Sequence, residues 1–170
     1  RILVVNKNGT YYTTDYDLSN HYEEGFSVLE KYEPEKVWSA VFFDAEQQFY
    51  YLKRFRFENV VRHTLFIGET EGSYLVALSG EKRPRFEVVF GGRYESRPAE
   101  VIVADEFIAE KSYKARGKRV TTYEVKQINE IEPLDSGEEE SEETASTDID
   151  FEITNPDMLS DETQMKLDFE

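Results

Sequence analysis

The sequence lacks cysteine altogether, which excludes disulfide scaffolds, cysteine-ligated zinc sites and thiol catalysis. It also shows no run of about 18 apolar residues, the length that a membrane-spanning helix needs, and no pattern of a secretion signal. We therefore expect a soluble protein of a reducing cytoplasm, with no membrane contact, whose stability comes from packing. The 12 Phe, 11 Tyr and one Trp among its 170 residues predict an aromatic-rich core.

The signatures of common active sites are also missing from the sequence. There is no glycine-rich loop that would hold phosphates, no two-histidine metal motif and no glycine-flanked nucleophilic serine. The two histidines, His21 and His63, stand alone, and an active site would require one of them to meet carboxylates in a pocket. Acidic residues two apart, more typical of turns than of cation sites, occur at Asp15 and Asp17 and at Asp148 and Asp150.

The formal charge of −16 is distributed unevenly along the chain. Residues 134–170 hold 14 acidic residues and one base, a charge of −13, whereas residues 1–133 hold 22 acids and 19 bases, a charge of −3. Low apolar content with high charge predicts a solvated segment that forms no core. The sequence thus predicts a folded body at 1–133 and an acidic, disordered, low-complexity tail at 134–170.

The body is predicted to be all-β, because β-branched and aromatic residues recur in short runs separated by turn residues. Residues 2–5 and 11–14 flank Asn8-Gly9, a dipeptide typical of a type I′ hairpin turn, which needs a positive φ at both central residues. Two further hairpins are predicted, 37–43 with 49–57 and 74–78 with 86–90, and shorter strands at 26–29, 64–67 and 101–103.

The links of the three hairpins fall near residues 8, 46 and 80, at spacings of about 38 and 34 residues. Such spacing is typical of repeated units, including propeller-like blades of four strands. A single sandwich or barrel with evenly placed hairpins fits as well, and the residues alone leave both architectures open. The chain starts at Arg1 directly in a strand, without an initiator methionine, so we expect it to be part of a longer protein.

Basic residues alternate with aromatic residues on two predicted strands and gather in one loop. In YYLKRFRFE at 50–58, strand alternation places Lys53 on the face of the phenylalanines and the two arginines on the other face. In EKRPRFEVVF at 81–90, the same parity separates two arginines from the apolar side chains. In KSYKARGKR at 111–119, five bases and no acid surround Gly117.

Clusters of this kind suit contacts with nucleic-acid phosphates, which give affinity without sequence preference. Ordinary solvated surface is the competing interpretation, because the 22 acids of the same body could pair with these bases. A β-rich protein-interaction or ligand-binding domain, without a nucleic-acid role, is a further alternative. Buried aromatics with a continuous stripe of arginines would favour DNA, whereas acid-paired arginines with exposed aromatics would favour protein interaction.

Five segments of the body carry a resemblance to a known family. They are ILVVNKNGTYYTTDYDLSNHY (2–22), KVWSAVFFDAE (36–46), YLKRF (51–55), RPRFEVVFGG (83–92) and EFIAEKSYKARGKRVTTYEVKQINEIEP (106–133). These segments resemble the final part of the A subunit of a bacterial type IIA topoisomerase, the topoisomerase IV and DNA gyrase family. The most specific piece is KARGKRVTTYEV, whose KARGKR is a degenerate form of the glycine-arginine box of gyrase, so topoisomerase IV-like behaviour is implied rather than supercoil introduction.

The resemblance implies a β-pinwheel, a disc of four-stranded blades, of which this chain would hold a part and the rest would lie upstream of Arg1. It implies a non-catalytic domain that binds and bends duplex DNA, positioning it for ATP-dependent strand passage by the parent isomerase. ATP, magnesium and the strand-breaking tyrosine belong to other parts of that enzyme, so no cofactor or metal is expected here. Arg93-Tyr94 resembles the cleavage-site pair but follows two glycines in a β-rich setting.

The partners implied are double-stranded DNA and, through other regions, the topoisomerase B subunit and a second A subunit; the implied location is the nucleoid in the bacterial cytoplasm. Carried over to this sequence, the resemblance places its basic residues on or near a DNA-facing rim, where they neutralise phosphates. These residues are Lys53, Arg54, Arg56, Lys82, Arg83, Arg85, Lys111, Lys114, Arg116, Lys118 and Arg119.

Near its end the tail contains QMKLDF (164–169), which resembles the glutamine-plus-hydrophobic hexapeptides that bind the bacterial replication sliding clamp. The resemblance implies that Gln164 enters a polar subsite, while Met165, Leu167 and Phe169 anchor in apolar ones. An inert or self-docking end is the alternative. A short helix from Ser160 is also expected, and the acids of the tail would either shield the basic rim or simply keep the chain soluble.

Overall fold

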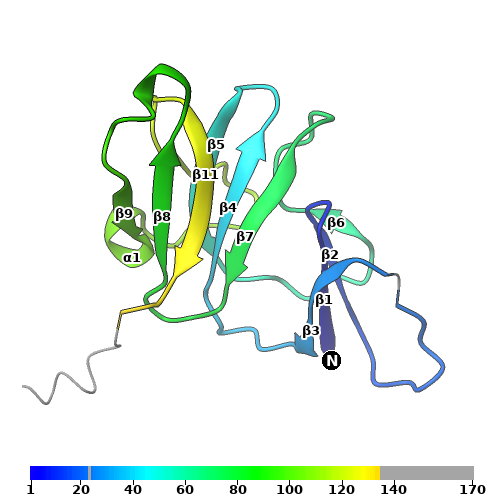
Figure 1. Ribbon diagram of the computed structural model, residues 1–170. Coiled ribbons are helices and arrows are strands. Elements are labelled where there is room, and N and C mark those ends of the chain that lie inside the picture. Colours follow the sequence, from blue (N-terminus) through cyan, green and yellow to red (C-terminus); the bar gives the residue numbers. More distant parts are fainter. Residues whose placement is uncertain (23, 135–170) are drawn as a thin grey trace, which may run out of the picture. The chain divides into compact units, whose positions relative to one another are not determined.

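The computed structural model describes residues 1–22 and 24–134, which belong to one compact unit, Arg1–Leu134 (Figure 1). Within these residues no helix is long and apolar enough to cross a membrane. The elements in chain order are β1 (Ile2–Asn6), β2 (Thr10–Thr14), β3 (Phe26–Lys31), β4 (Trp38–Asp44), β5 (Phe49–Phe55), β6 (Thr64–Leu65), β7 (Tyr74–Ser79), β8 (Arg85–Phe90), the 3-10 helix η1 (Gly92–Tyr94), β9 (Glu100–Val103), α1 (Ala104–Phe107), β10 (Lys118–Arg119) and β11 (Val125–Ile131).

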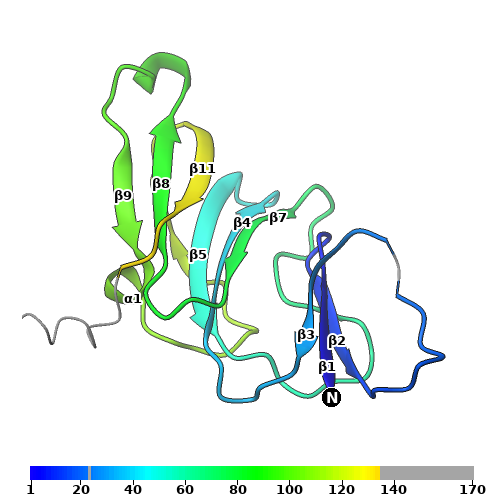
Figure 2. The ribbon, with the colours of Figure 1, turned by 60° about the horizontal axis from the view of Figure 1, so that its bottom comes forward.

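The strands form three antiparallel sheets, which confirms the prediction of an all-β fold built from blades. Sheet 1 has the strand order β3-β1-β2-β6, sheet 2 the order β10-β5-β4-β7, and sheet 3 the order β11-β8-β9. Figures 1 and 2 show the sheets following one another, with sheet 2 between the other two. Separate blades are neither one sandwich nor one closed barrel, so the structure decides the choice that the hairpin spacing left open.

In sheets 1 and 2, one edge strand comes from a segment that, in the sequence, lies between two strands of the next sheet. β6 follows the hairpin of sheet 2 along the chain but pairs with β2, and β10 follows the hairpin of sheet 3 but pairs with β5. The residue that follows each of these edge strands donates a further backbone hydrogen bond. Phe66 N–H donates to the Gly9 carbonyl at 2.9 Å, and Val120 N–H donates to the Tyr50 carbonyl at 2.8 Å. Backbone pairing therefore links the blades in addition to side-chain packing.

Two clusters of buried side chains join the sheets. The cluster between sheets 1 and 2 includes Tyr11, Phe42 and Phe55, and the cluster between sheets 2 and 3 includes Val41 and Phe86. Neighbouring residues of β4 point to opposite faces, so sheet 2 is covered on both sides and six of the seven β4 residues are buried. This two-sided burial explains why β4 reads as a continuous apolar run rather than as an alternating one.

The first two predicted hairpins are confirmed as β1-β2 and β4-β5, but the turn type predicted for the first is wrong. Gly9 has a φ of 90°, and Asn8 has no positive φ. Gly9 N–H donates to the Asn6 carbonyl at 3.1 Å, and the Asn8 side chain accepts a hydrogen bond from Thr10 N–H at 3.0 Å. The hairpin is closed by a turn that needs one left-handed glycine instead of two left-handed residues.

The third predicted hairpin, 74–78 with 86–90, is wrong. β7 pairs with β4 in sheet 2, whereas β8 pairs with β9 and β11 in sheet 3. In the link between them Gly80 has no positive φ, and Pro84 holds the chain extended just before β8. The link therefore carries the chain from one sheet to the next. The predicted strands at 26–29, 64–67 and 101–103 overlap β3, β6 and β9, and the sequence analysis missed β10 and β11.

Several predictions for the tail concern residues that the structure does not describe. They are the cation pair Asp148 and Asp150, the helix from Ser160 and the hexapeptide 164–169.

Replacing Phe55 should test whether the core between sheets 1 and 2 holds the fold. Phe55 has no exposed surface and its ring centroid lies 4.8 Å from that of Phe57. We expect Phe55→Ala to lower the free energy of unfolding by about 3–5 kcal/mol, measured by urea denaturation. Tyr16, which is 58% exposed, provides the matched control, and a loss in Phe55→Ala no larger than in Tyr16→Ala would contradict the packing.

Candidate nucleic-acid interface

The basic loop, defined as residues 111–119, connects the segment after α1 to β10 and lies against β5. Its one aromatic side chain, Tyr113, is 6% exposed and packs edge-on against Tyr11, with ring centroids 5.6 Å apart. All five of its basic residues are exposed: Lys111, Lys114, Arg116, Lys118 and Arg119. The loop is thus anchored in the core by one ring while its charges remain in solvent.

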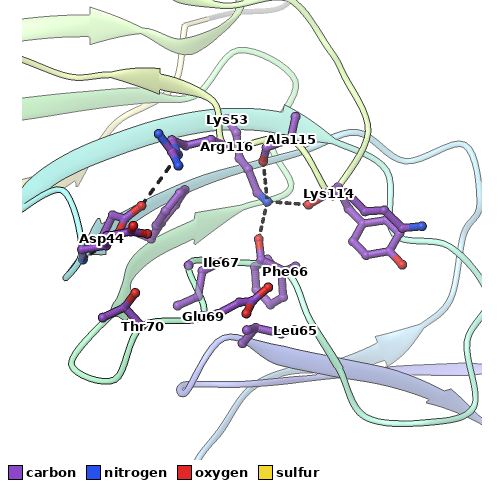
Figure 3. A pocket seen from close by; sticks show the side chains of 14 residues that line it. Asp44, Lys53, Leu65, Phe66, Ile67, Glu69, Thr70, Lys114, Ala115 and Arg116 are labelled. Atoms are coloured by element: carbon purple, nitrogen blue, oxygen red, sulfur yellow. Dashed lines mark hydrogen bonds and ion pairs between the residues drawn. The ribbon is translucent and has the colours of Figure 1, made fainter.

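Lys53 lies in the interior, which corrects the prediction that it contacts DNA. It is 3% exposed, because strand alternation places it on the core face of β5. Its ammonium group donates hydrogen bonds to the backbone carbonyls of Phe66, Tyr113 and Ala115, the last two at 2.5 and 3.1 Å (Figure 3). Lys53 therefore ties β5 to the segment after β6 and to the basic loop.

The environment of Lys53 balances its burial. Three carbonyl acceptors match the three N–H donors of an ammonium group, so the buried charge is fully hydrogen-bonded. The rings of Phe55 and Phe42 add cation–π contacts, with centroids 5.1 and 5.7 Å from Nζ. Burial away from water nevertheless disfavours the charged form and lowers the pKa of Lys53 to about 8.

Gly117 allows the basic loop to approach β5 closely. Its φ is +94°, a left-handed conformation that other residues adopt at a cost. A Cβ atom added at this position would lie 2.6 Å from the carbonyl oxygen of Leu52 and 2.8 Å from the Cβ of Lys53. The glycine in KARGKR is therefore required both by backbone conformation and by space.

Cations of the loop lie over aromatic rings, and few acidic side chains lie close to them. Arg119 is 4.0 Å from the ring centroid of Phe49, and Nζ of Lys118 is 4.3 Å from that of Phe107. Within residues 1–22 and 24–134, the loop's one ion pair joins Arg116 to Asp44, at 3.8 Å (Figure 3). Stacking on a ring orients a cation without neutralising it, so these charges stay available to an anion.

The arginines of the β4-β5 hairpin form more interactions within the domain than the cations of the basic loop do. The predicted parity is confirmed, because Lys53 and Phe55 are buried while Arg54 is half-buried and Arg56 exposed. Arg56 forms ion pairs with Glu35 at 2.8 Å and with Glu110 at 2.9 Å. Arg54 donates one hydrogen bond, at 3.3 Å, to a backbone carbonyl next to α1.

The basic residues that precede or begin β8 show a similar pattern. Arg83 forms ion pairs with Asp105 at 3.1 Å and with Glu106 at 2.8 Å. Arg85 donates to the carbonyl of Glu132 at 2.7 Å. Lys82 is exposed, and the described part of the chain offers it no ion pair. Most of this second group is thus already paired within the domain.

The burial of the aromatic side chains favours DNA binding, whereas the pairing of the arginines does not. Tyr51, Phe55, Phe57 and Phe86 are buried and Tyr50 is half-buried, as expected for a DNA-binding domain. The arginines, however, do not form one stripe of free charges, because those of the two hairpins are paired. Among the residues predicted to contact DNA, the group with the least neutralised positive charge is therefore the basic loop.

His63 and the acid pair Asp15 and Asp17 make local contacts of a structural kind. The ring of His63 stacks on Tyr12, with centroids 4.3 Å apart, and His21 is exposed. Asp15 and Asp17 each accept a hydrogen bond from a backbone N–H two residues further along, as turn residues do. Among the residues that the structure describes, no three His, Asp or Glu side chains gather in a metal-binding group.

Comparison with known proteins decides the family. A family model described as the topoisomerase C-terminal domain of Bacteroidota matches residues 1–132. The chain belongs to this family. No curated protein and no solved structure matches it. The whole basic loop and all three blades of this topoisomerase C-terminal domain fall within the matched residues.

The anchoring roles of Tyr113 and Lys53 in this topoisomerase C-terminal domain were not predicted from the sequence: Tyr113 was not singled out, and Lys53, although placed on the face of the phenylalanines, was assigned to the DNA-facing rim. Tyr113 is the one aromatic residue in KSYKARGKR, which marks it as an anchor among charges. Lys53 shares strand parity with Phe55, which marks it as a core residue. The carbonyls that make its burial tolerable belong to segments 13 and 60 residues away, and no local pattern reveals them.

The lowered pKa of Lys53 predicts how the stability of the topoisomerase C-terminal domain changes with pH. Between pH 8 and the ordinary lysine value of 10.5, the unfolded chain keeps a proton that the folded domain has lost, so stability rises with pH. Relative to Lys53→Met, the wild type should gain about 1–2 kcal/mol between pH 8 and 9.5, measured by urea unfolding. A difference between the two proteins that stays constant with pH would show that Lys53 keeps its ordinary pKa.

Gly117 can be tested against a glycine that shares its conformation but not its surroundings. Gly25 has a φ of +91° and would place a new Cβ in open space, whereas Gly117 would place one against β5. We expect Gly25→Ala to cost about 1 kcal/mol of unfolding free energy and Gly117→Ala about 2–4 kcal/mol, because steric conflict adds to backbone strain. Equal losses in the two variants would contradict the close approach of the loop to β5.

Proposed function

We propose that this topoisomerase C-terminal domain binds duplex DNA through the exposed cations of its basic loop. The observation that supports the proposal is the setting of those cations: five exposed bases on a segment held by Tyr113, Lys53 and Gly117, with one acid, Asp44, at ion-pair distance. Positive charges that are fixed in place and largely unneutralised are what phosphate contacts require.

The chemistry of the loop favours contacts with the DNA backbone over contacts with bases. Its cations are lysines and arginines on an irregular surface segment, and neither a helix nor a long strand projects there to enter a groove. Phosphate contacts release condensed counterions, so affinity depends steeply on salt and little on sequence. Such binding suits a domain that holds or bends any duplex presented to it.

The remaining basic residues are proposed to contribute less. Arg56 and Arg83 would have to exchange carboxylates for a phosphate, and the carboxylates left beside them would repel that phosphate. Arg54 and Arg85 donate to backbone carbonyls, whereas Lys82 is exposed and has no ion pair within the described residues, so it could add a contact. The proposed surface is therefore centred on the basic loop rather than on the basic residues of β5 and β8.

We further propose that the domain belongs to the A subunit of a type IIA topoisomerase of the topoisomerase IV kind. Support comes from the family match and from the segment at 114–125. In that setting the domain positions duplex DNA for ATP-dependent strand passage in the bacterial nucleoid. ATP, magnesium, the B subunit and the second A subunit would engage other regions of the parent enzyme.

The sliding clamp remains a proposed partner on sequence grounds alone. The hexapeptide at 164–169 lies outside the described residues, so the structure adds nothing to that hypothesis.

Removal of loop charges should weaken DNA binding more than removal of paired charges. The test compares Arg116→Gln/Lys118→Gln/Arg119→Gln with Arg56→Gln/Arg83→Gln/Arg97→Gln, a control that deletes three arginines held in ion pairs. With a fluorescein-labelled 30-base-pair duplex and the full chain, the loop variant should lose about 10- to 100-fold in affinity near 0.1 M salt, and its salt slope should fall by about one per lost contact.

Three outcomes decide the DNA-binding proposal. The control variant should retain affinity within a few-fold of the wild type, with both variants checked for folding by circular dichroism. Equal losses in the two variants would remove the basic loop as the binding surface. Affinity of the wild type that does not change between 0.05 and 0.3 M salt would remove phosphate contacts altogether.

A further inference from the structure

A second surface feature, separate from the exposed outer side of the basic loop, lies between sheets 2 and 3. The β4-β5 turn and the β8-β9 connection lie at the same end of their sheets (Figures 1 and 2). Between sheet 2 and the segments around η1 and before β11 is a cleft of about 430 Å³. We call it the aromatic cleft, because its lining includes Phe43, Phe49, Tyr50, Tyr94 and Tyr123.

One wall of the aromatic cleft is a group of rings on sheet 2. The centroids of Phe43 and Tyr50 are 5.0 Å apart, and Tyr74 stacks on Phe43 at 5.4 Å with an interplanar angle of 27°. The hydroxyl groups of Tyr50 and Tyr74 lie 3.2 Å apart, within hydrogen-bond distance. Tyr74, which is 46% exposed, does not itself line the cleft but packs beside Phe43 and Tyr50, which do.

The opposite wall carries two tyrosines and two arginines. Tyr94 and Tyr123 have ring centroids 4.9 Å apart, and Tyr123 is 36% exposed. The guanidinium group of Arg97 lies 4.0 Å from the centroid of Tyr123, and that of Arg93 lies 5.3 Å from Tyr94. Arg97 is also ion-paired with Glu100, at 3.3 Å, so Arg93 is the cation beside these rings that keeps its charge unpaired within the described residues.

Charge on the first wall comes from the basic loop itself. Arg119, the last residue of the loop, stacks on Phe49, which lines the aromatic cleft. Polar groups also line it: the side chains of Gln48, Thr121 and Thr122 can donate and accept hydrogen bonds, and the carboxylate of Glu124 can accept them. The cleft therefore combines flat aromatic faces with hydrogen-bonding groups, and an arginine contacts a lining ring on each side: Arg119 on Phe49 and Arg93 on Tyr94.

We propose that the aromatic cleft binds unpaired bases of single-stranded nucleic acid. A base is a flat ring with polar edges attached to a phosphate, and each of these three parts has a counterpart in the cleft. The exposed tyrosines provide stacking surfaces, the amide, hydroxyl and carboxylate groups face base edges, and Arg93 and Arg119 meet the flanking phosphates. This activity goes beyond duplex binding, which needs no stacking surface.

The observations favour a nucleic acid over a proline-rich peptide, the other ligand that aromatic clefts accept. A peptide in a polyproline conformation needs aromatic ridges but no cations, whereas here arginines accompany the rings on both walls. The cleft also adjoins the proposed duplex surface through Arg119, so a strand held by the loop would have its bases next to the tyrosines.

The test measures binding of the full chain to a fluorescein-labelled 12-nucleotide single strand and to the same strand with abasic sites at its six central positions. We expect the base-containing strand to bind about 10-fold or more tightly than the abasic one, because each stacked base contributes about 1–3 kcal/mol. The abasic strand keeps every phosphate, so equal affinity for the two strands would overturn the proposal without any mutation of the protein.

Variants then locate the binding surface. Tyr50→Ala and Tyr123→Ala, which remove lining rings of the cleft, should each weaken single-strand binding about 5- to 50-fold, whereas Tyr50→Phe and Tyr123→Phe, which keep the ring, should stay within two- to three-fold of the wild type. Tyr16→Ala removes an exposed tyrosine that does not line the cleft and should have no effect. Equal effects of the three alanine variants would overturn the assignment. So would a competition experiment in which a decaproline peptide displaces the strand fully and an excess of nucleotide does not displace it.

Duplex affinity, measured in parallel, separates this inference from the proposed function. The tyrosine variants should leave duplex binding unchanged, and the loop variant Arg116→Gln/Lys118→Gln/Arg119→Gln should weaken it. Loss of duplex binding in the loop variant with retained preference for bases over abasic sites supports both proposals. A wild-type domain that binds duplex but shows no preference for bases overturns only the one made here.

Discussion

The arrangement of the functional surface depends on the hydrogen bonds that the ammonium group of Lys53 donates. A buried cation is tolerated only when its donors are satisfied, and here the acceptors are backbone carbonyls from the segment after β6 and from the basic loop. One side chain of sheet 2 therefore holds in place both a segment that completes sheet 1 and the loop that leads to β10. A change in its charge acts on all three segments at once.

Sheet 2 is central for a second reason, since it is covered on both faces and receives β10 from the chain that leaves sheet 3. The same two-residue strand carries Lys118 and Arg119, so the element that closes the sheet also carries two of the exposed cations. Structural closure and surface charge thus meet in one short segment. Between residues 1 and 133 the charge is only −3, so the positive surface arises from placement and not from net charge.

Local patterns in the sequence predicted the type of structure well and the pairing of strands less well. Alternation in β5 and β8 correctly separated buried rings from outward bases, because parity is a local property of an extended chain. The link between β7 and β8 was wrongly predicted to be a hairpin turn. Two apolar runs joined through a glycine have the same sequence pattern whether the chain turns back to the same sheet or crosses to another one. β10 is two residues long, too short to leave a pattern, and β6 is equally short, although the apolar run at 64–67 marked its position.

By itself, the sequence determined the all-β class, the three-unit spacing, the family resemblance and the cluster of bases around Gly117, because each of these depends on neighbouring residues or on composition. Only the tertiary structure decided which bases are available. Lys53 is buried, Arg56 and Arg83 are paired with acids distant in sequence, and the loop cations are exposed. Whether a charge is free depends on what the fold brings within a few ångströms of it, and that proximity is not written in any local stretch of the chain.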